Sequence, residues 1–262
     1  MEQTWYATMT MKVGRIPYLE YEPLYFDMAR RGIAMYKMVP SQLAVAAAVG
    51  EIDAGPVPLV DCFRLEDRFQ PVSGFCLACT ERAGNIFLYS KQPIEQLKDA
   101  RIGITDETST SLRLLQVLLS LKYHVQPEAY VTLQEPYDAF LLIGNRALRQ
   151  RWGARGYPYT YDLGEEWYRW TGLPFVHARW IVRQDLAPRD IVVLEDALYV
   201  GLEDGMDALY HQSDPRNDLL MRPRDIVAYI DGLSYFIGMS EQKAIDQFRT
   251  YLDQLGGQAR CV

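Results

Sequence analysis

Hydroxyl side chains stand at the start of two apolar runs of helical length. They are Ser41, which follows Pro40, and the consecutive Thr108, Ser109 and Thr110. Ser and Thr oxygens accept the first backbone N–H groups of a helix and so act as N-caps. The same N–H groups, at the positive end of the helix dipole, also bind carboxylates and phosphates. Each turn is therefore either a helix cap or one half of an anion-binding site.

Sulfur and imidazole groups do not indicate a metal or redox centre. Cys76 and Cys79 form a C-x-x-C pattern inside an apolar, strand-like run, where odd spacing directs the two thiols to opposite faces. The sequence contains no second Cys/His pair with the spacing of zinc ligands. The three histidines, His124, His177 and His211, are isolated, which favours surface or core positions. We therefore expect no metal site.

Composition favours a soluble globular protein with a small-molecule ligand. Of its 262 residues, 49% are hydrophobic and 23% charged, which is ordinary for such proteins. The net charge of −7 argues against nucleic acid as a partner, and no polybasic segment indicates membrane binding. The longest apolar run, 43–49, is too short to cross a bilayer, and residues 1–11 lack the features of a secretory signal. We expect a cytoplasmic protein and leave its oligomeric state open.

The elements that must position these residues alternate between strands and helices. We expect strands at 12–19, 34–39, 52–59, 69–79, 85–90, 101–105, 129–133, 139–143, 157–162 and 175–182. Helices are expected at 23–32, 42–49, 60–67, 94–100, 111–121 and 146–152, and again from about residue 190. The last helix, 225–255, is interrupted at Gly232 and Gly238, and 163–174 is expected to be a loop.

This order predicts an α/β protein of two lobes with a ligand cleft between them. The first lobe would comprise residues 1–92 and 186–262, and the second residues 93–185. Loops at the carboxyl ends of strands would face the cleft, where open α/β sheets bind ligands. Ser41 and the turn at Thr108 would then approach from opposite lobes. Two facing anion sites would suit a small dicarboxylate.

Seven collinear motifs between residues 11 and 185 resemble the menaquinone-biosynthesis enzymes of the futalosine route, and most nearly the chorismate dehydratases. The motifs are Val13-Gly-Arg-Ile-Pro-Tyr-Leu19, Val39-Pro-Ser-Gln-Leu43, Gly50-Glu-Ile-Asp-Ala-Gly-Pro-Val-Pro-Leu59, Leu88-Tyr-Ser-Lys-Gln-Pro-Ile94, Leu141-Leu-Ile-Gly144, Tyr161-Asp-Leu-Gly-Glu-Glu-Trp167 and Thr171-Gly-Leu-Pro-Phe-Val176. The resemblance implies a fold like the type II periplasmic binding proteins. It also implies a cofactor-free lyase that removes water from chorismate to give 3-[(1-carboxyvinyl)oxy]benzoate.

The resemblance also assigns site residues. Ser41, Ser109 and Thr110 would bind the substrate carboxylates, and the wider substrate-binding set would include Tyr18, Gly55, Pro56, Thr108 and Asn145. Glu20 and Asn85 stand where the family has its reaction centre. At these two positions chorismate dehydratases usually have Asn and Ser, and at the position of Asn145 they usually have Asp.

These departures leave several functions open. Glu20 could be a general base whose pKa is raised in the cleft, with Asn85 as a hydrogen-bond donor to the reacting oxygen. An ionised Glu20 would also repel a dianion at contact distance by about 1 to 4 kcal/mol, which favours a less anionic ligand. Glu20 could instead be a structural loop residue that pairs with Arg15 or another arginine. A family member acting on another small molecule, or a carboxylate-binding protein without catalysis, is the alternative.

Overall fold

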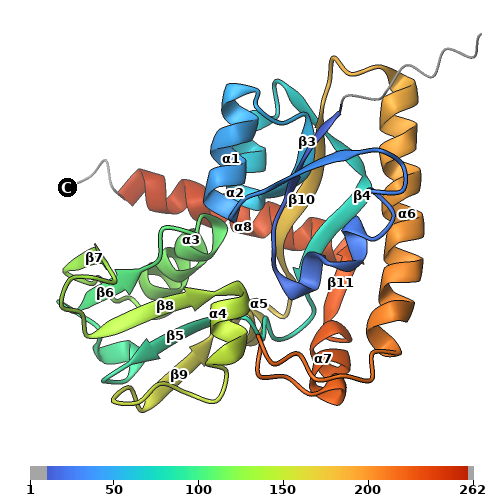
Figure 1. Ribbon diagram of the computed structural model, residues 1–262. Helices are drawn as coiled ribbons and strands as arrows, with labels where there is room; N and C mark the ends of the chain where they lie inside the picture. Colours follow the sequence, from blue (N-terminus) through green and yellow to red (C-terminus); the bar gives the residue numbers. More distant parts are fainter. Residues whose placement is uncertain (1–10, 259–262) are drawn as a thin grey trace, which may run out of the picture.

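The computed structural model describes residues 11–258, which form two β-sheets joined by crossing segments (Figure 1). The first sheet has the order β11-β4-β10-β3-β1-β2. Its strands are β1 (Lys12–Arg15), β2 (Ala34–Lys37), β3 (Ala54–Pro58), β4 (Phe69–Cys79), β10 (Phe175–Arg183) and β11 (Leu233–Phe236). The second sheet has the order β7-β6-β8-β5-β9. Its strands are β5 (Ile86–Ser90), β6 (Arg101–Ile104), β7 (Ala129–Thr132), β8 (Ala139–Ile143) and β9 (Tyr159–Asp162).

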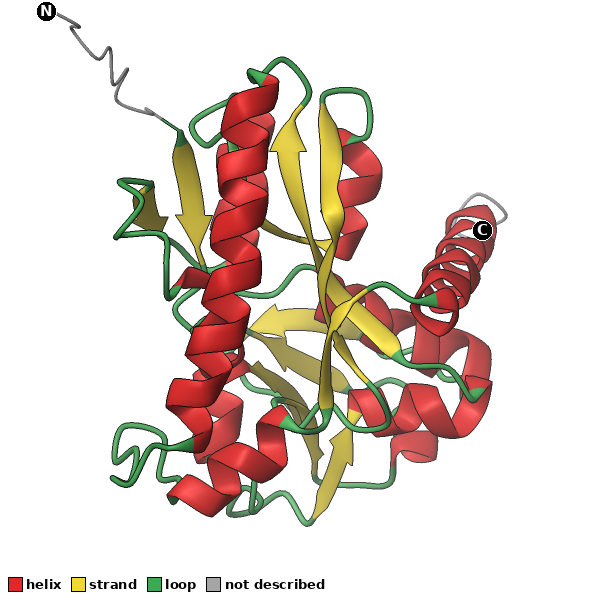
Figure 2. Cartoon of the chain, turned by 90° about the vertical axis from the view of Figure 1, so that its right-hand side faces the viewer, coloured by secondary structure: helices red, strands yellow, loops and turns green. Residues whose placement is uncertain are grey.

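Helices cover both sheets and connect the lobes. They are α1 (Pro40–Val49), α2 (Leu59–Leu65), α3 (Thr110–Val117), α4 (Gly144–Arg149), α5 (Leu163–Thr171), α6 (Pro188–Tyr210), α7 (Pro223–Ile230) and α8 (Met239–Gln258). Short 3₁₀ turns occupy Leu19–Tyr21, Pro23–Tyr25 and Ile94–Gln96, and a π-helical turn, Leu118–Lys122, prolongs α3. Figure 2 shows α6 running beside the first sheet toward the second lobe.

The chain crosses between the sheets at positions that differ from the predicted boundaries. β5 pairs with β8 and β9 and so belongs to the second lobe, whereas β10 pairs with β3 and β4 of the first. The crossings therefore lie at residues 80–85 and 172–174, one strand earlier than the predicted boundaries at 92/93 and 185/186. Both strands are rich in apolar residues, and such a composition does not reveal which sheet a strand joins.

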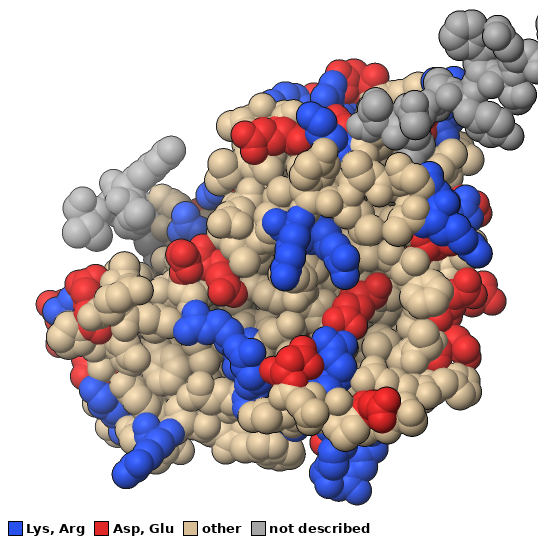
Figure 3. Space-filling view, viewed as in Figure 1, with Lys and Arg blue, Asp and Glu red and all other residues tan. Residues whose placement is uncertain are grey.

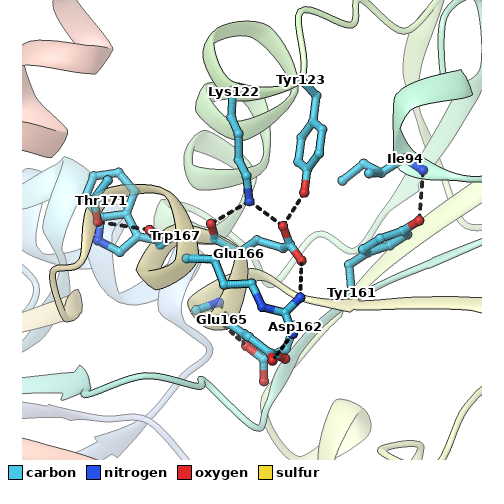
Figure 4. Close-up of polar contacts among 11 residues, drawn as sticks. Ile94, Lys122, Tyr123, Tyr161, Asp162, Glu165, Glu166, Trp167 and Thr171 are labelled. Atoms are coloured by element: carbon cyan, nitrogen blue, oxygen red, sulfur yellow. Dashed lines mark hydrogen bonds and ion pairs between the residues drawn. The ribbon is translucent and has the colours of Figure 1, made fainter.

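The segment 163–174, predicted to be a loop, contains helix α5. The Asp162 carboxylate caps it by accepting the N–H groups of Gly164 (2.9 Å) and Glu165 (3.1 Å), and Gly172 ends it in the left-handed conformation. Glu166 then anchors the helix to the π-helical turn, because Lys122 and Tyr123 both donate to its carboxylate (Figure 4). The helix predicted at 23–32 is absent, because this segment contains only a 3₁₀ turn. The predicted breaks at Gly232 and Gly238 are confirmed, and the residues between them form strand β11.

An aromatic cluster holds α5, β10 and α8 together beside the second crossing. Trp167 is fully buried, and its ring lies 5.3 Å from that of Phe175 and 5.8 Å from that of Phe248. Its indole N–H donates to the carbonyl of Pro174 (2.9 Å). Burial of three large rings stabilises this junction through both apolar area and ring geometry. The cluster thereby fixes the start of β10 relative to both lobes.

Candidate functional site

A small cavity lies between the two lobes, at the point where several predicted site residues converge. Its volume is about 40 Å³, which is far below the several hundred Å³ of typical ligand pockets. A ring-sized acid can therefore enter only if the lobes move apart. The predicted site residues that line the cavity are Tyr18, Glu20, Asn85, Ser109 and Thr110.

Glu20 is a buried carboxylic acid in this cavity wall. It lies on the 3₁₀ turn that follows β1, and only 2% of its surface is exposed. Its Oε1 accepts a hydrogen bond from the Asn85 amide (2.7 Å), whereas its Oε2 is buried and has no hydrogen-bond partner among residues 11–258. Burial raises the pKa of Glu20 to about 7, against the lowering effects of its own backbone N–H, the Tyr229 hydroxyl and the Asn85 amide. The acid is therefore poised to titrate near neutral pH.

Tyrosine residues lie beside Glu20, in place of the arginine that the sequence allowed as its partner. The Tyr235 hydroxyl donates to the Glu20 backbone carbonyl (2.8 Å), and the buried Tyr229 hydroxyl lies beside the Glu20 carboxylate. Arg15 instead lies over the ring of Tyr25, at 5.5 Å from its centroid. Within residues 11–258, Glu20 forms no ion pair at 4.0 Å or less, so the pairing with Arg15 is absent.

Asn85 connects Glu20 to the second lobe. Its side chain is buried and donates to Glu20, while its backbone carbonyl accepts the Gly144 N–H (2.9 Å). Asn85 lies in the first crossing, directly before β5. Movement of the lobes would therefore change the contact between this amide and the carboxylate.

The hydroxyl turn before α3 contacts the first lobe. Ser109 donates to the Asp61 carboxylate, and Thr110 Oγ1 accepts the Val60 N–H (3.3 Å). Asp61 of α2 thus occupies the position beside the N-terminus of α3 where a substrate carboxylate was predicted. Thr108 Oγ1 accepts the Leu112 N–H (3.2 Å), which is the capping role that the sequence left open.

Four further hydrogen bonds, formed by the side chains of three residues, hold the lobes closed. The Tyr18 hydroxyl donates to Glu107 (2.6 Å), and the Ser41 hydroxyl donates to the Asp106 carbonyl (2.6 Å). Asn145 accepts the Leu19 N–H and donates to the Pro17 carbonyl, each at 3.1 Å. Ser41 and Asn145 therefore lie at the interface between the lobes but outside the cavity lining.

Gly55 and Pro56, which were predicted to line the cleft, lie inside the first sheet. They pair with Ile181 and Trp180 of β10, and both are buried. Pro58, two residues further along β3, reaches the cavity instead. Because β3 is buried on every residue, the sequence could not indicate where along the strand the cavity begins.

The cleft contains more carboxylates than a site for a dianion would be expected to contain. Asp61 and Glu107 join Glu20 at the boundary between the lobes, and their nearest cations are Arg64, 2.9 Å from Asp61, and Arg146, 4.0 Å from Glu107. Figure 3 shows acidic and basic side chains interspersed across this face of the molecule. The site can therefore discriminate between ligands by their charge.

Sequence reasoning missed three residues around this cavity. Asp61 gave no signal beyond its place in a predicted helix, and Tyr229 lies more than two hundred residues from its neighbour Glu20. His177, expected on the surface or in the core, lines the cavity. Only a three-dimensional arrangement could reveal such contacts, because they join residues from separate elements.

A larger and more open groove, about 890 Å³, lies between α2, α3 and α8. Arg64 and Arg249 line it, but both already pair with carboxylates, Asp61 and Glu66 respectively. The buried acid and the predicted site residues lie in the interlobe cavity, which we take as the candidate site.

Within residues 11–258, no three His, Cys, Asp or Glu side chains gather as metal ligands would. In the same range, none of the helices combines the length and the apolar character needed to span a bilayer.

Comparison with known proteins gives one family and one fold. Residues 11–254 match a family model described as menaquinone biosynthesis. The chain is 27% identical over 210 residues to a chorismate dehydratase of Thermus thermophilus, covering 72% of this chain and 77% of that protein. A solved structure of an Archaeoglobus fulgidus protein has a TM-score of 0.68 at 17% identity, covering 94% of this chain and 98% of that one.

The alkanesulfonate-binding protein SsuA of Xanthomonas axonopodis, solved with bound MOPS, has a TM-score of 0.62 at 12% identity, covering 95% of this chain and 93% of that one. These similarities confirm the predicted two-lobed fold of the periplasmic-binding-protein type.

Proposed function

This chain belongs to the menaquinone biosynthesis family, and we propose that it is a cytoplasmic, cofactor-free lyase acting on chorismate or a close relative. The reaction eliminates water and yields 3-[(1-carboxyvinyl)oxy]benzoate. A base takes a ring hydrogen as a proton, the C–H electron pair becomes part of the aromatic ring, and the ring hydroxyl departs. The proton and the departing hydroxide together make the water. Similarity to a chorismate dehydratase supports this chemistry.

The raised pKa of Glu20 is the observation that best supports this proposal. A general base works best when its pKa lies near the operating pH, and burial raises the pKa of this carboxyl to about 7. Perturbed acids in clefts are characteristic of catalytic sites. Glu20 Oε2 takes no part in the hydrogen bond with Asn85, which uses Oε1, and so it can accept a proton while that bond is kept.

Asn85 would act on the oxygen that leaves. Its amide has two N–H groups, and within residues 11–258 it donates one hydrogen bond, to Glu20 (2.7 Å). The second N–H can stabilise negative charge on a departing hydroxyl or on a carboxylate. The same residue would thus orient the base and assist the leaving group.

Substrate carboxylates would bind at Ser109 and Thr110. In the closed structure Asp61 occupies this turn, so the substrate must displace an internal carboxylate as the lobes open. The electrostatic penalty from Glu20 is limited, because with a pKa of about 7 it is largely protonated below neutral pH. Binding would therefore be favoured on the acidic side of pH 7 and proton removal on the basic side.

A second candidate function is the same chemistry on a less anionic molecule. It is favoured by Asp61 and Glu107, two carboxylates that stand beside the hydroxyl groups of Ser109 and Tyr18. A ligand with one carboxylate, or with a cationic group, would meet less repulsion there.

The test is incubation of the purified protein with chorismate, followed by mass spectrometry of the products. We expect loss of one water and a rate at least a hundredfold lower in Glu20→Gln. The rate should be unchanged in Glu51→Gln, which alters an exposed acid. Heat-inactivated protein gives the uncatalysed background. Equal rates in Glu20→Gln and the wild type would refute the role of Glu20.

A further inference from the structure

His177 sits at an irregularity between two strands. Along β10 and β4, Val176 pairs with Ala78 and Ala178 pairs with Leu77, so that His177 is the extra residue between two successive pairs. On the other side of β10, pairing with β3 reaches no further than Ala178. A β-bulge re-aims the side chain that it carries, and bulges are over-represented beside active sites.

The His177 side chain lines the same cavity as Glu20 and Asn85. Its ring lies against Phe175 in an edge-to-face arrangement, with the centroids 5.0 Å apart. Both ring nitrogens are buried, and neither has a hydrogen-bond partner in the part of the chain that the structure describes. Buried polar groups are nearly always paired in native proteins, and each one left unpaired is destabilising. Two such atoms on one cavity-lining ring require an explanation.

The charge state of this ring limits what it can do. Burial lowers the pKa of His177 to about 3, so the imidazole is neutral under ordinary conditions. A neutral imidazole has one N–H donor and one nitrogen acceptor. It cannot supply a positive charge to a dianion, but it can donate a hydrogen bond to an oxygen that enters the cavity.

We propose that His177 is a ligand-contacting residue of the cleft, and that it donates its ring N–H to a carboxylate or hydroxyl oxygen of the bound acid. This inference rests on the proposed function, because it assigns a further residue to the same site. The other two histidines are exposed and offer no comparable contact. His177 approaches from β10, whereas Ser109 and Thr110 approach from α3, so the ligand would be held from both lobes.

The test compares His177→Phe and His177→Asn with the control His211→Asn, which changes an exposed histidine. Without ligand, His177→Phe should unfold at the same temperature as the wild type or higher, since it keeps the ring and removes two unpaired nitrogens. With chorismate, its kcat/KM should fall about ten- to a hundredfold, the range expected for one hydrogen bond to a charged group. His177→Asn, which retains a donor, should recover part of this loss.

Ring resonances of the three histidines provide a second readout. Addition of chorismate should shift the ring ¹⁵N and ¹H signals of His177 and leave those of His211 unchanged. Wild-type kcat/KM in His177→Phe would overturn the proposal, and so would a lowered unfolding temperature together with an unchanged His177 signal.

Failure of the proposed function would look different. If the wild type neither converts nor binds chorismate, the proposed dehydratase activity is refuted, and all variants give the same negative result. The unfolding temperature of the ligand-free protein then tests the role of His177. Greater stability of His177→Phe than of the wild type supports a residue kept for ligand contact, and lower stability overturns the proposal.

Discussion

Replacement of Glu20 by Gln should change how stability depends on pH. Burial raises the pKa of Glu20 from its ordinary value of 4.5 to about 7. Between these values the folded protein keeps the proton while the unfolded chain releases it, so folding becomes less favourable as pH rises. The stabilisation from the protonated acid is complete below pH 4.5 and lost once pH exceeds about 7. A shift of this size corresponds to about 3 kcal/mol.

The Glu20→Gln variant has no proton to release at this position. Its unfolding free energy relative to the wild type should therefore increase by about 2 to 3 kcal/mol between pH 5 and pH 8. Any fixed effect of the amide, such as an unpaired N–H in place of Oε2, is the same at both pH values and cancels in this comparison.

The assay is urea unfolding followed by tryptophan fluorescence, which reports on the buried Trp167. Wild type, Glu20→Gln and the exposed-site control Glu51→Gln are measured at pH 5 and pH 8. The control should track the wild type at both. If the difference between Glu20→Gln and wild type is the same at the two pH values, Glu20 titrates as an ordinary surface acid, and the physical reason for making it a base is removed.

Two further substitutions test the framework of the site. Asp162→Ala removes the acceptor of four backbone N–H groups that join the first crossing to α5. It should lower the unfolding free energy by about 3 kcal/mol, measured in urea, and an unchanged midpoint would contradict this. Gly144→Ala adds a Cβ only 2.6 Å from the Tyr18 ring at a φ of +58°, so kcat/KM with chorismate should fall at least tenfold. Gly153→Ala, where φ is +117° and no described atom lies within 4 Å of the added Cβ, is the matched control. It should keep wild-type kinetics, and equal kinetics in both variants would contradict the clash.

Local sequence patterns predicted most of the strands because hydrophobic periodicity depends on neighbouring residues. They failed at α5, although the capping residue Asp162 and the terminal Gly172 were both present, because the segment between them mixes charged and aromatic side chains. They also failed at the lobe boundaries. The partners of β5 and β10 are set by tertiary packing, which an apolar run cannot encode on its own.

The site was predicted through resemblance more than through spacing. Glu20 and Asn85 are 65 residues apart, on a 3₁₀ turn and in a crossing segment, yet their side chains meet. Gly55 and Pro56 were misplaced because β3 is buried throughout. His177 gave no periodic signal, since a bulge interrupts the alternation that would have placed its side chain.

The role of Glu20 as the base for the elimination is tested most directly by the pH dependence of kcat/KM for chorismate. A base must be ionised to act, so kcat/KM should rise about tenfold per pH unit below 7 and level off above it, following the pKa of about 7. In Glu20→Gln this rise should disappear together with most of the rate. A wild-type profile that is flat between pH 5 and 9, or that falls across this range, would contradict the assignment.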